Sequence, residues 1–128
     1  MSTRVKHISN ECNGALSAIR DTLYVLSGKW KIQVIVLLRD GPMRFNELQR
    51  SLVDITPKVL SKELRELELN EFVERKVFNT VPVTVTYEIT PYAATLDPII
   101  NSLKEWGTQH RARIVEHMKQ ESKQPVSS

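Results

Sequence analysis

Residues 41–89 carry two helix signals followed at once by two strand signals, and this order limits the fold more than any other feature of the chain. Apolar side chains at helical spacing predict a short helix over residues 45–51. Thr56 and Pro57 then form a strong helix start, because Thr caps the first turn and Pro fits the first helical position. A second helix is therefore predicted over residues 57–69.

Two strands are expected after that second helix. Residues 83–89 alternate apolar and polar side chains without interruption, which is the pattern of a half-buried strand. Residues 72–78 show a weaker version of the pattern, so we expect an antiparallel hairpin with its tip at residues 79–82. Pro82 cannot donate a backbone hydrogen bond, which suits a tip or a sheet edge. Residues 43–44 are expected to pair as a very short additional strand.

Further helices flank this unit on both sides. Apolar periodicity predicts helices over residues 15–26 and 29–38, with a break at Gly28, and a long helix from Thr90 to about residue 118. Pro98 lies inside the long helix and is expected to kink or break it. The predicted fold class is therefore α+β and mostly helical. It is a winged helix-turn-helix, in which one helix enters the DNA major groove beside a β-ribbon, with extra N- and C-terminal helices.

Composition narrows the class of protein. The 128 residues are 41% hydrophobic and 26% charged, as in a single globular domain. No apolar run reaches the ~18 residues that a membrane span needs, and the N-terminus lacks an apolar leader, so we expect a cytoplasmic protein without a membrane partner. A single cysteine and three scattered histidines show no ligand spacing, so neither a metal nor another cofactor is expected.

The helix over residues 57–69 has two different faces. Helical geometry puts Leu60, Leu64, Leu67 and Glu71 on one side, which is expected to face the core. The opposite side is cationic. Such a face is most often only solvated, but the preceding helix, the following ribbon and the formal net charge of +3 favour contact with DNA. The residues predicted to read bases are Thr56, Lys58, Ser61, Lys62 and Arg65, and those predicted to contact the DNA backbone are Arg44, Asn46, Arg50, Asn79 and Thr80.

Two other functions compete with DNA binding. An enzyme is disfavoured, because the sequence has no Gly-rich phosphate loop, no nucleophile elbow and no metal-ligand cluster. A winged helix can instead serve as a protein-interaction module, with the wing as a docking edge. Such a module would show no salt-sensitive DNA binding, which distinguishes the two hypotheses.

Short motifs occur in a fixed order along residues 12–110, and as a set they are more specific than any one alone. They are Cys12, GKW at 28–30, RFNEL at 44–48, ITPKVL at 55–60, LRELE at 64–68, VER at 73–75, VP at 81–82, Tyr87, TPY at 90–92 and WG at 106–107. On these motifs the chain resembles the HxlR-type winged-helix transcriptional regulators of bacteria. The match divides the chain into a flexible N-terminal segment at 1–11, the family domain at 12–110, and the end of the last helix with a polar tail at 111–128.

The resemblance implies a regulator, most often a repressor, that binds a pseudo-palindromic operator as a homodimer. The two copies of the helix over residues 57–69 would read successive major grooves of double-stranded DNA. The N- and C-terminal helices would form the dimer interface, and the effector, an oxidant or a small molecule, is unidentified. The dimer-interface residues mapped in this way are Leu16, Ile19, Leu23, Leu26, Leu96, Ile99, Ile100, Leu103 and Trp106.

Cys12 has two interpretations. Some members of the family sense oxidants or electrophiles through an N-terminal cysteine, so Cys12 is a candidate redox sensor that bridges to the partner's Cys12 or is alkylated. A position near a helix N-terminus would favour the thiolate that such chemistry needs. The other interpretation is an unreactive thiol near the interface.

The sequence departs from the family at two turns. Asn70 and Glu71 stand where the family usually has Asp-Gly, and Ala93 stands where it usually has Gly. Because the helix over residues 57–69 lacks its usual Gly, we expect Asn70 to adopt the left-handed cap conformation, which Asn tolerates. Neither departure touches the predicted DNA face.

Overall fold

The structure, a computed structural model, describes residues 10–123. The predicted flexible segment, apart from its last two residues, and residues 124–128 of the predicted tail therefore lie outside the described residues. None of the helices in the described part is long and apolar enough to cross a membrane. In chain order the elements are α1 (Asn10–Val25), α2 (Lys31–Leu38), α3 (Phe45–Ser51), α4 (Pro57–Leu69), β1 (Val73–Phe78), β2 (Thr84–Ile89), the 3₁₀ helix η2 (Pro91–Leu96) and α5 (Asp97–Lys123).

The helix-turn-helix and the hairpin form where the sequence predicts them. α3 and α4 have the predicted bounds, and each strand begins one residue later than predicted. The strands pair antiparallel along their whole length. The very short strand is confirmed as a single bridge, in which Met43 and Tyr87 exchange backbone hydrogen bonds of 3.0 and 2.8 Å. The bridge ties the segment before α3 to the wing, by which we mean β1, β2 and residues 79–83.

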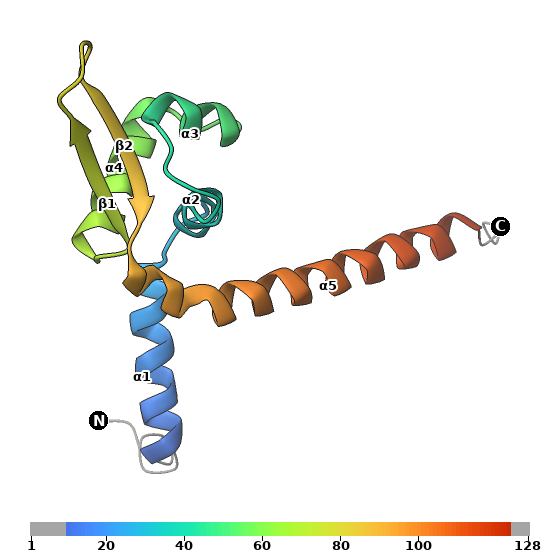
Figure 1. Cartoon of the computed structure of the whole chain (residues 1–128). Helices are drawn as coiled ribbons and strands as arrows, with labels where there is room; N and C mark the ends of the chain where they lie inside the picture. Colours follow the sequence, from blue (N-terminus) through green and yellow to red (C-terminus); the bar gives the residue numbers. More distant parts are fainter. Residues whose placement is uncertain (1–9, 124–128) are drawn as a thin grey trace.

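The helix-turn-helix and the wing form a body from which the two end helices project (Figure 1). α2, α3 and α4 lie beside the hairpin, whereas α1 and the long α5 leave the body in different directions. Beyond its first turns α5 extends away from the other elements. Most of the side chains of these two helices are therefore exposed in a single copy of the chain.

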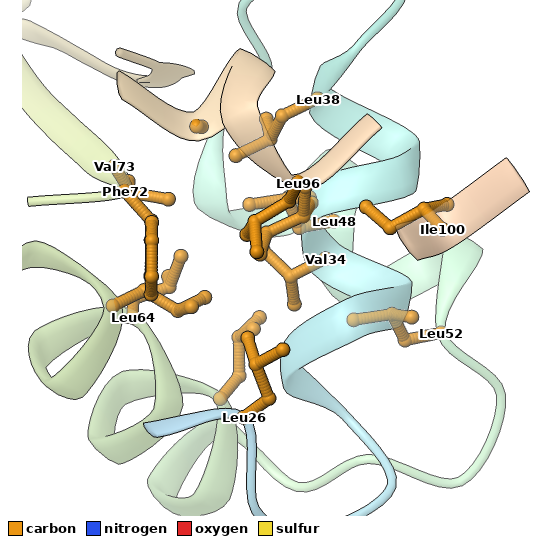
Figure 2. Close-up of a cluster of buried hydrophobic side chains, with 14 of the residues drawn as sticks. Leu26, Val34, Leu38, Leu48, Leu52, Leu64, Phe72, Val73, Leu96 and Ile100 are labelled. Atoms are coloured by element: carbon orange, nitrogen blue, oxygen red, sulfur yellow. The ribbon is translucent and has the colours of Figure 1, made fainter. Parts of the chain in front are cut away.

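An apolar core joins α2, α3, α4 and the base of the wing (Figure 2). Val34, Leu38, Leu48 and Leu64 are almost fully buried in it. Full burial of an aliphatic side chain of this size stabilises a fold by about 1.5–3 kcal/mol. Because the apolar face of α4 lies in this core, its opposite face is left to solvent.

The turn after α4 corrects the expectation for Asn70. Asn70 has φ −90° and ψ 10°, whereas Glu71 has φ 66° and is the left-handed residue. The Glu71 amide donates to the Glu68 carbonyl and the Phe72 amide to the Leu67 carbonyl, each at 3.0 Å, which is the Schellman pattern. The prediction that Glu71 continues the buried seam is also wrong, because the helix has ended before it and its side chain is exposed.

The segment after β2 is not one continuous helix. The Thr90 hydroxyl accepts a hydrogen bond from the Ala93 amide at 3.2 Å and starts η2. α5 begins at Asp97, and Pro98 lies in its first turn, where the missing amide hydrogen costs no intrahelical bond. The break predicted for Pro98 is confirmed, and α5 continues to Lys123, beyond the expected end.

Candidate nucleic-acid interface

The turn between α3 and α4 is held by apolar anchors at both ends. Leu52 and Ile55 are both buried in the core. Between them Asp54 has φ 71°, a left-handed conformation that Asp tolerates better than most residues. The Ile55 amide donates to the Leu52 carbonyl at 3.4 Å. α4 therefore leaves the turn in a direction that the core defines.

The start of α4 follows the local signal in the sequence. The Thr56 hydroxyl accepts a hydrogen bond from the Val59 amide at 3.2 Å, and Pro57 occupies the first helical position. Thr56 is exposed, but its hydroxyl oxygen already caps the helix. The other amides of the first turn point along the helix axis and suit a phosphate oxygen.

The two faces of α4 separate as predicted. Leu60, Leu64 and Leu67 are buried. The exposed face carries Lys58, Ser61, Lys62 and Arg65. Among the described residues Lys58 and Arg65 have no ion-pair partner, and Lys62 Nζ lies 3.9 Å from Glu66 Oε1. Most of this positive charge is therefore available to an anion outside the chain.

The three polar residues predicted around α3 are all exposed. They are Arg44, Asn46 and Arg50. The Arg44 amide donates to the Glu47 carboxylate at 2.9 Å, which fixes the start of α3, and Arg50 lies in the last turn. Neither arginine side chain forms an ion pair within residues 10–123.

The tip of the wing is closed by its own hydrogen bonds. The Thr80 hydroxyl donates to the Pro82 carbonyl at 2.6 Å and lies 2.8 Å from the Thr84 hydroxyl. Asn79 and Thr80 are both exposed, as predicted. Because the hydroxyl proton of Thr80 is committed to the turn, Asn79 is the better placed of the two to donate to a phosphate.

The apolar character of the wing tip was not predicted. Val81 is fully exposed, and Phe78 and Val83 are largely exposed. The wing cation Lys76 is engaged, because its ammonium lies 2.5 Å from Glu88 Oε1, and this hydrogen bond raises the pKa of Lys76. The wing thus offers apolar groups at its tip, a feature that was visible in the sequence as valines on both sides of the proline.

A buried ion pair behind α4 was also not predicted. Lys31 opens α2, and its side chain is only 3% exposed, with the ammonium 2.8 Å from Glu63 Oε2 and 2.5 Å from Glu66 Oε2. Burial lowers the pKa of Lys31, but hydrogen bonds to the two carboxylates outweigh this effect and raise the pKa above 10.5. The hydrogen bond from Lys31 lowers the pKa of Glu66 below 4.5. Lys31 and Glu66 are therefore both charged at neutral pH.

The predicted dimer residues divide into two groups. Leu26, Leu96 and Ile100 are buried in the core of the chain itself, so the structure places them inside the protomer rather than on its surface. The other six are exposed on the two projecting helices. They are Leu16, Ile19 and Leu23 on α1, and Ile99, Leu103 and Trp106 on α5.

Cys12 lies in α1 and is exposed. Cys12, Leu16, Ile19 and Leu23 are spaced by four, three and four residues along the helix. At 3.6 residues per turn this spacing places them on one face. The thiol is therefore part of the apolar stripe of α1.

A helix-turn-helix with an exposed cationic second helix, followed by a two-stranded wing, defines a winged-helix DNA-binding protein. The chain matches the HxlR-like helix-turn-helix family over residues 25–115, and it belongs to that family. A relative in Halalkalibacterium halodurans, the uncharacterized HTH-type transcriptional regulator BH0655, is 43% identical over 107 residues, which cover 79% of this chain and 95% of that protein.

Solved structures with the same fold include two redox-state structures of regulators. The redox regulator HypR in its reduced form has a TM-score of 0.72 and 39% identity, and the match covers 77% of this chain and 98% of HypR. The reduced form of the transcriptional regulator YodB from Bacillus subtilis has a TM-score of 0.62 and 32% identity. This match covers 80% of this chain and 93% of YodB. These matches confirm the predicted family and winged-helix fold. The family consists of transcriptional regulators, which are not enzymes.

Proposed function

We propose that this chain is a repressor that binds a pseudo-palindromic operator as a homodimer, with α4 of each protomer in the major groove. The observation that carries the proposal is the exposed cationic face of α4 opposite a fully buried seam. Arg65 has the geometry to bond O6 and N7 of guanine with two hydrogen bonds, and Ser61 can donate or accept. The buried seam keeps this face turned outward.

Affinity and specificity would come from different side chains. Arg44 and Arg50, outside α4, are suited to phosphate contacts, which are independent of sequence and weaken as salt is raised. Lys62 and Arg65, in the middle of α4, are suited to base edges. Substitutions in the two groups should therefore have different signatures.

Two uncovered apolar stripes support dimerisation. Both lie on helices that project from the body, and contiguous exposed apolar surface of this kind marks protein interfaces. A second copy would cover both stripes. The two-fold symmetry of such a dimer would match a pseudo-palindrome, with one α4 in each half-site.

A fluorescence anisotropy titration tests specific binding. The probes are the DNA upstream of the chain's own gene, or a duplex selected in vitro from a random library, and a scrambled duplex, each at two salt concentrations. We expect the wild type to bind its operator about 10³-fold or more tightly than the scrambled duplex. If no selected duplex is preferred, the chain is not a sequence-specific regulator.

Two double variants separate base reading from phosphate contact. Lys62→Ala/Arg65→Ala should weaken operator binding by about 1–3 kcal/mol per residue and relax the preference for the operator. Arg44→Ala/Arg50→Ala should weaken binding to both duplexes alike and reduce the salt slope by about four, because the dimer loses two phosphate contacts in each protomer. The opposite pattern would reject the assignment of the two groups.

A matched control also removes two positive charges, but on α5, at a distance from α4. Arg111 and Lys119 are exposed on α5 and, by helical geometry, point away from the side that carries Trp106. Arg111→Ala/Lys119→Ala should change neither the affinity for the operator nor the affinity for the scrambled duplex. A loss as large as that of the α4 variant would show that net charge, and not the α4 face, governs binding.

Repression is tested by transcription in vitro from the promoter that carries the operator. The transcript should fall as the protein is added, because a dimer on the operator blocks access to the promoter. A transcript that is unchanged or increased at saturating protein would contradict repression while leaving DNA binding intact.

We further propose that oxidation of Cys12 changes DNA affinity. In support, Cys12 lies on the α1 stripe that would face a second copy, and the similar protein HypR is a redox regulator. Cys12 and the partner's Cys12 would form a disulfide, and the two thiols would lose two protons and two electrons to an oxidant such as diamide. Treated wild type should show a cross-linked dimer on a non-reducing gel and an altered affinity, and Cys12→Ser should show neither. Equal affinity before and after treatment would refute this response.

The apolar wing tip favours a second function, that of a protein-docking module. Val81 at the tip is fully exposed, and a partner protein could cover it and its neighbours. This alternative predicts no DNA binding by the wild type even at low salt. Salt-sensitive operator binding by the wild type would contradict this alternative, and binding that survives in a Val81→Ser variant would show that the Val81 side chain is not needed for DNA contact.

A further inference from the structure

Lys31 joins three segments of the chain at one buried point. Its Nζ donates to Glu63 Oε2 at 2.8 Å, contacts Glu66 Oε2 at 2.5 Å, and lies 3.5 Å from the carbonyl of Ser27 in the turn after α1. An ammonium group has three protons to donate, so these three acceptors satisfy it. Lys31 and Glu63 are the two charged side chains that are buried within residues 10–123.

The apolar seam sets which face of α4 turns inward, and the buried ion pair adds directional contacts to it. Contacts of Leu60, Leu64 and Leu67 with the core are non-directional, whereas hydrogen bonds weaken steeply with distance and angle. Glu63 and Glu66 are three residues apart and therefore neighbours on one side of α4. Holding both carboxylates on one ammonium fixes the rotation of the helix about its own axis.

The residues of the DNA face adjoin these carboxylates. Lys62 precedes Glu63 and Arg65 precedes Glu66, so any rotation of α4 moves the inner and the outer side chains together. Glu66 contacts both the buried lysine and the exposed face, because its Oε2 contacts Lys31 and its Oε1 lies 3.9 Å from Lys62 Nζ. One carboxylate thus links the buried lysine to a lysine of the exposed face.

We propose that Lys31 is a positioning residue for DNA reading, which through Glu63 and Glu66 fixes the rotation of α4 that presents Lys62 and Arg65 to the operator. This inference rests on the proposed function of α4. Apolar side chains of similar size are often as stabilising as a buried ion pair, whereas fixing one geometry is an attested role of buried polar groups. The role of Lys31 should therefore appear in specificity more than in stability.

The double variant Lys31→Met/Glu63→Leu separates these two properties. It replaces the buried pair with apolar groups of similar size and leaves Glu66, which is 36% exposed and reaches water. Binding to the scrambled duplex should stay within about twofold of the wild type, and the operator-to-scrambled ratio should fall by roughly five- to 150-fold, the factor that one good bidentate contact is worth. An unchanged ratio in the folded variant would overturn the proposal.

Leu38→Val is the control for loss of stability. Leu38 is a buried residue of the same helix, and its truncation leaves all three charged groups in place. The melting temperature should fall and the operator-to-scrambled ratio should not. A ratio that falls as far as in the double variant would show that destabilisation alone causes the effect, and would overturn the proposal.

Glu66→Gln provides a second variant if the double variant does not fold. It keeps the shape of the side chain and removes the charge that Lys31 and Lys62 share, so the ratio should again fall, and an unchanged ratio would overturn the proposal. Failure of the proposed function looks different from failure of this inference. In that case the wild type itself would prefer no duplex, which would refute both.

Discussion

Replacing Glu71 with Gly should stabilise the protein. Glu71 has φ 66° and closes α4 at the position where Gly is preferred. A residue with a Cβ is strained in this conformation by roughly 1–2 kcal/mol. Glu71 is also exposed at the C-terminal end of α4, where the helix dipole disfavours a negative charge by about 0.3–1 kcal/mol. Both effects disappear in the Glu71→Gly variant.

One opposing effect reduces this gain. Gly has more conformational freedom than Glu in the unfolded chain, which costs about 0.4–1 kcal/mol. The hydrogen bonds of the turn involve the backbone of residue 71, including the 2.6 Å bond from the Thr90 hydroxyl to its carbonyl, so they are retained. At the middle of each range the net gain is about 1.5 kcal/mol, which in a chain of this size raises the melting temperature by about 4–9 °C.

The assay is thermal unfolding followed by circular dichroism at one fixed protein concentration, since oligomerisation makes the melting temperature depend on concentration. Glu71→Ala removes the charge but keeps the Cβ, so it should gain less than Glu71→Gly. Asn70→Gly is the opposite control. Asn70 is not left-handed and its Nδ2 donates to the Glu66 carbonyl at 3.0 Å, so this variant should lose about 1 kcal/mol. A Glu71→Gly variant that melts below the wild type would refute the strain argument.

Two further predictions concern α4. Thr56→Ala removes the hydroxyl that caps the Val59 amide and should lower the free energy of unfolding, measured in urea, by about 1 kcal/mol. Thr56→Ser keeps a hydroxyl and should retain most of that stability. Equal losses in the two variants would contradict the cap. The folded pKa of Glu66 lies below 4.5, so its contribution is complete above pH 4.5 and is lost as the pH falls through the folded pKa. The pKa of Lys31 lies above 10.5, so its contribution is complete below pH 10.5 and is lost as the pH rises through the folded pKa. The difference in unfolding free energy between the wild type and Glu66→Gln should therefore hold at neutral pH and shrink as acid titrates Glu66 in the folded protein. A difference that stays constant while Glu66 becomes protonated, followed by NMR, would exclude the ion pair as its source.

Local signals were sufficient to predict the helix-turn-helix and the wing. Thr56 and Pro57 define the start of α4 from two adjacent residues, because capping and the fixed φ of proline act within one turn. The alternation over residues 83–89 predicts β2 because the period of a strand is a property of its own backbone. Neither inference needs to know which distant residue lies opposite.

Contacts between distant residues could not be predicted in this way. Lys31 and Glu63 are 32 positions apart, and nothing near Lys31 marks a lysine at a helix start as buried. Helical spacing likewise placed Leu26 and Ile100 on the apolar faces of their helices. It could not show whether they pack against the core of the same chain, as the structure has it, or against a second copy.

The left-handed residue after α4 was assigned wrongly for a different reason. Asn70 was expected there because Asn tolerates positive φ better than Glu does. The last hydrogen bonds of α4 decide the position instead, since they run from Glu71 and Phe72 back to the helix and leave Asn70 within its final turn. Intrinsic tolerance ranks residues at a given position, whereas the point at which the helix ends decides which position is left-handed.

The arrangement of charge on α4 also depends on the buried lysine. α4 is formally neutral, with three cations and three carboxylates, so an attraction to phosphate requires the two signs to lie on different sides. Lys31 holds Glu63 and Glu66 on the inner side and compensates one of them. Lys31→Met alone should therefore weaken binding to every duplex, because it leaves an extra negative charge behind the DNA face. Lys31→Met/Glu63→Leu removes one charge of each sign and leaves the field nearly unchanged, which is why its defect should be confined to the operator.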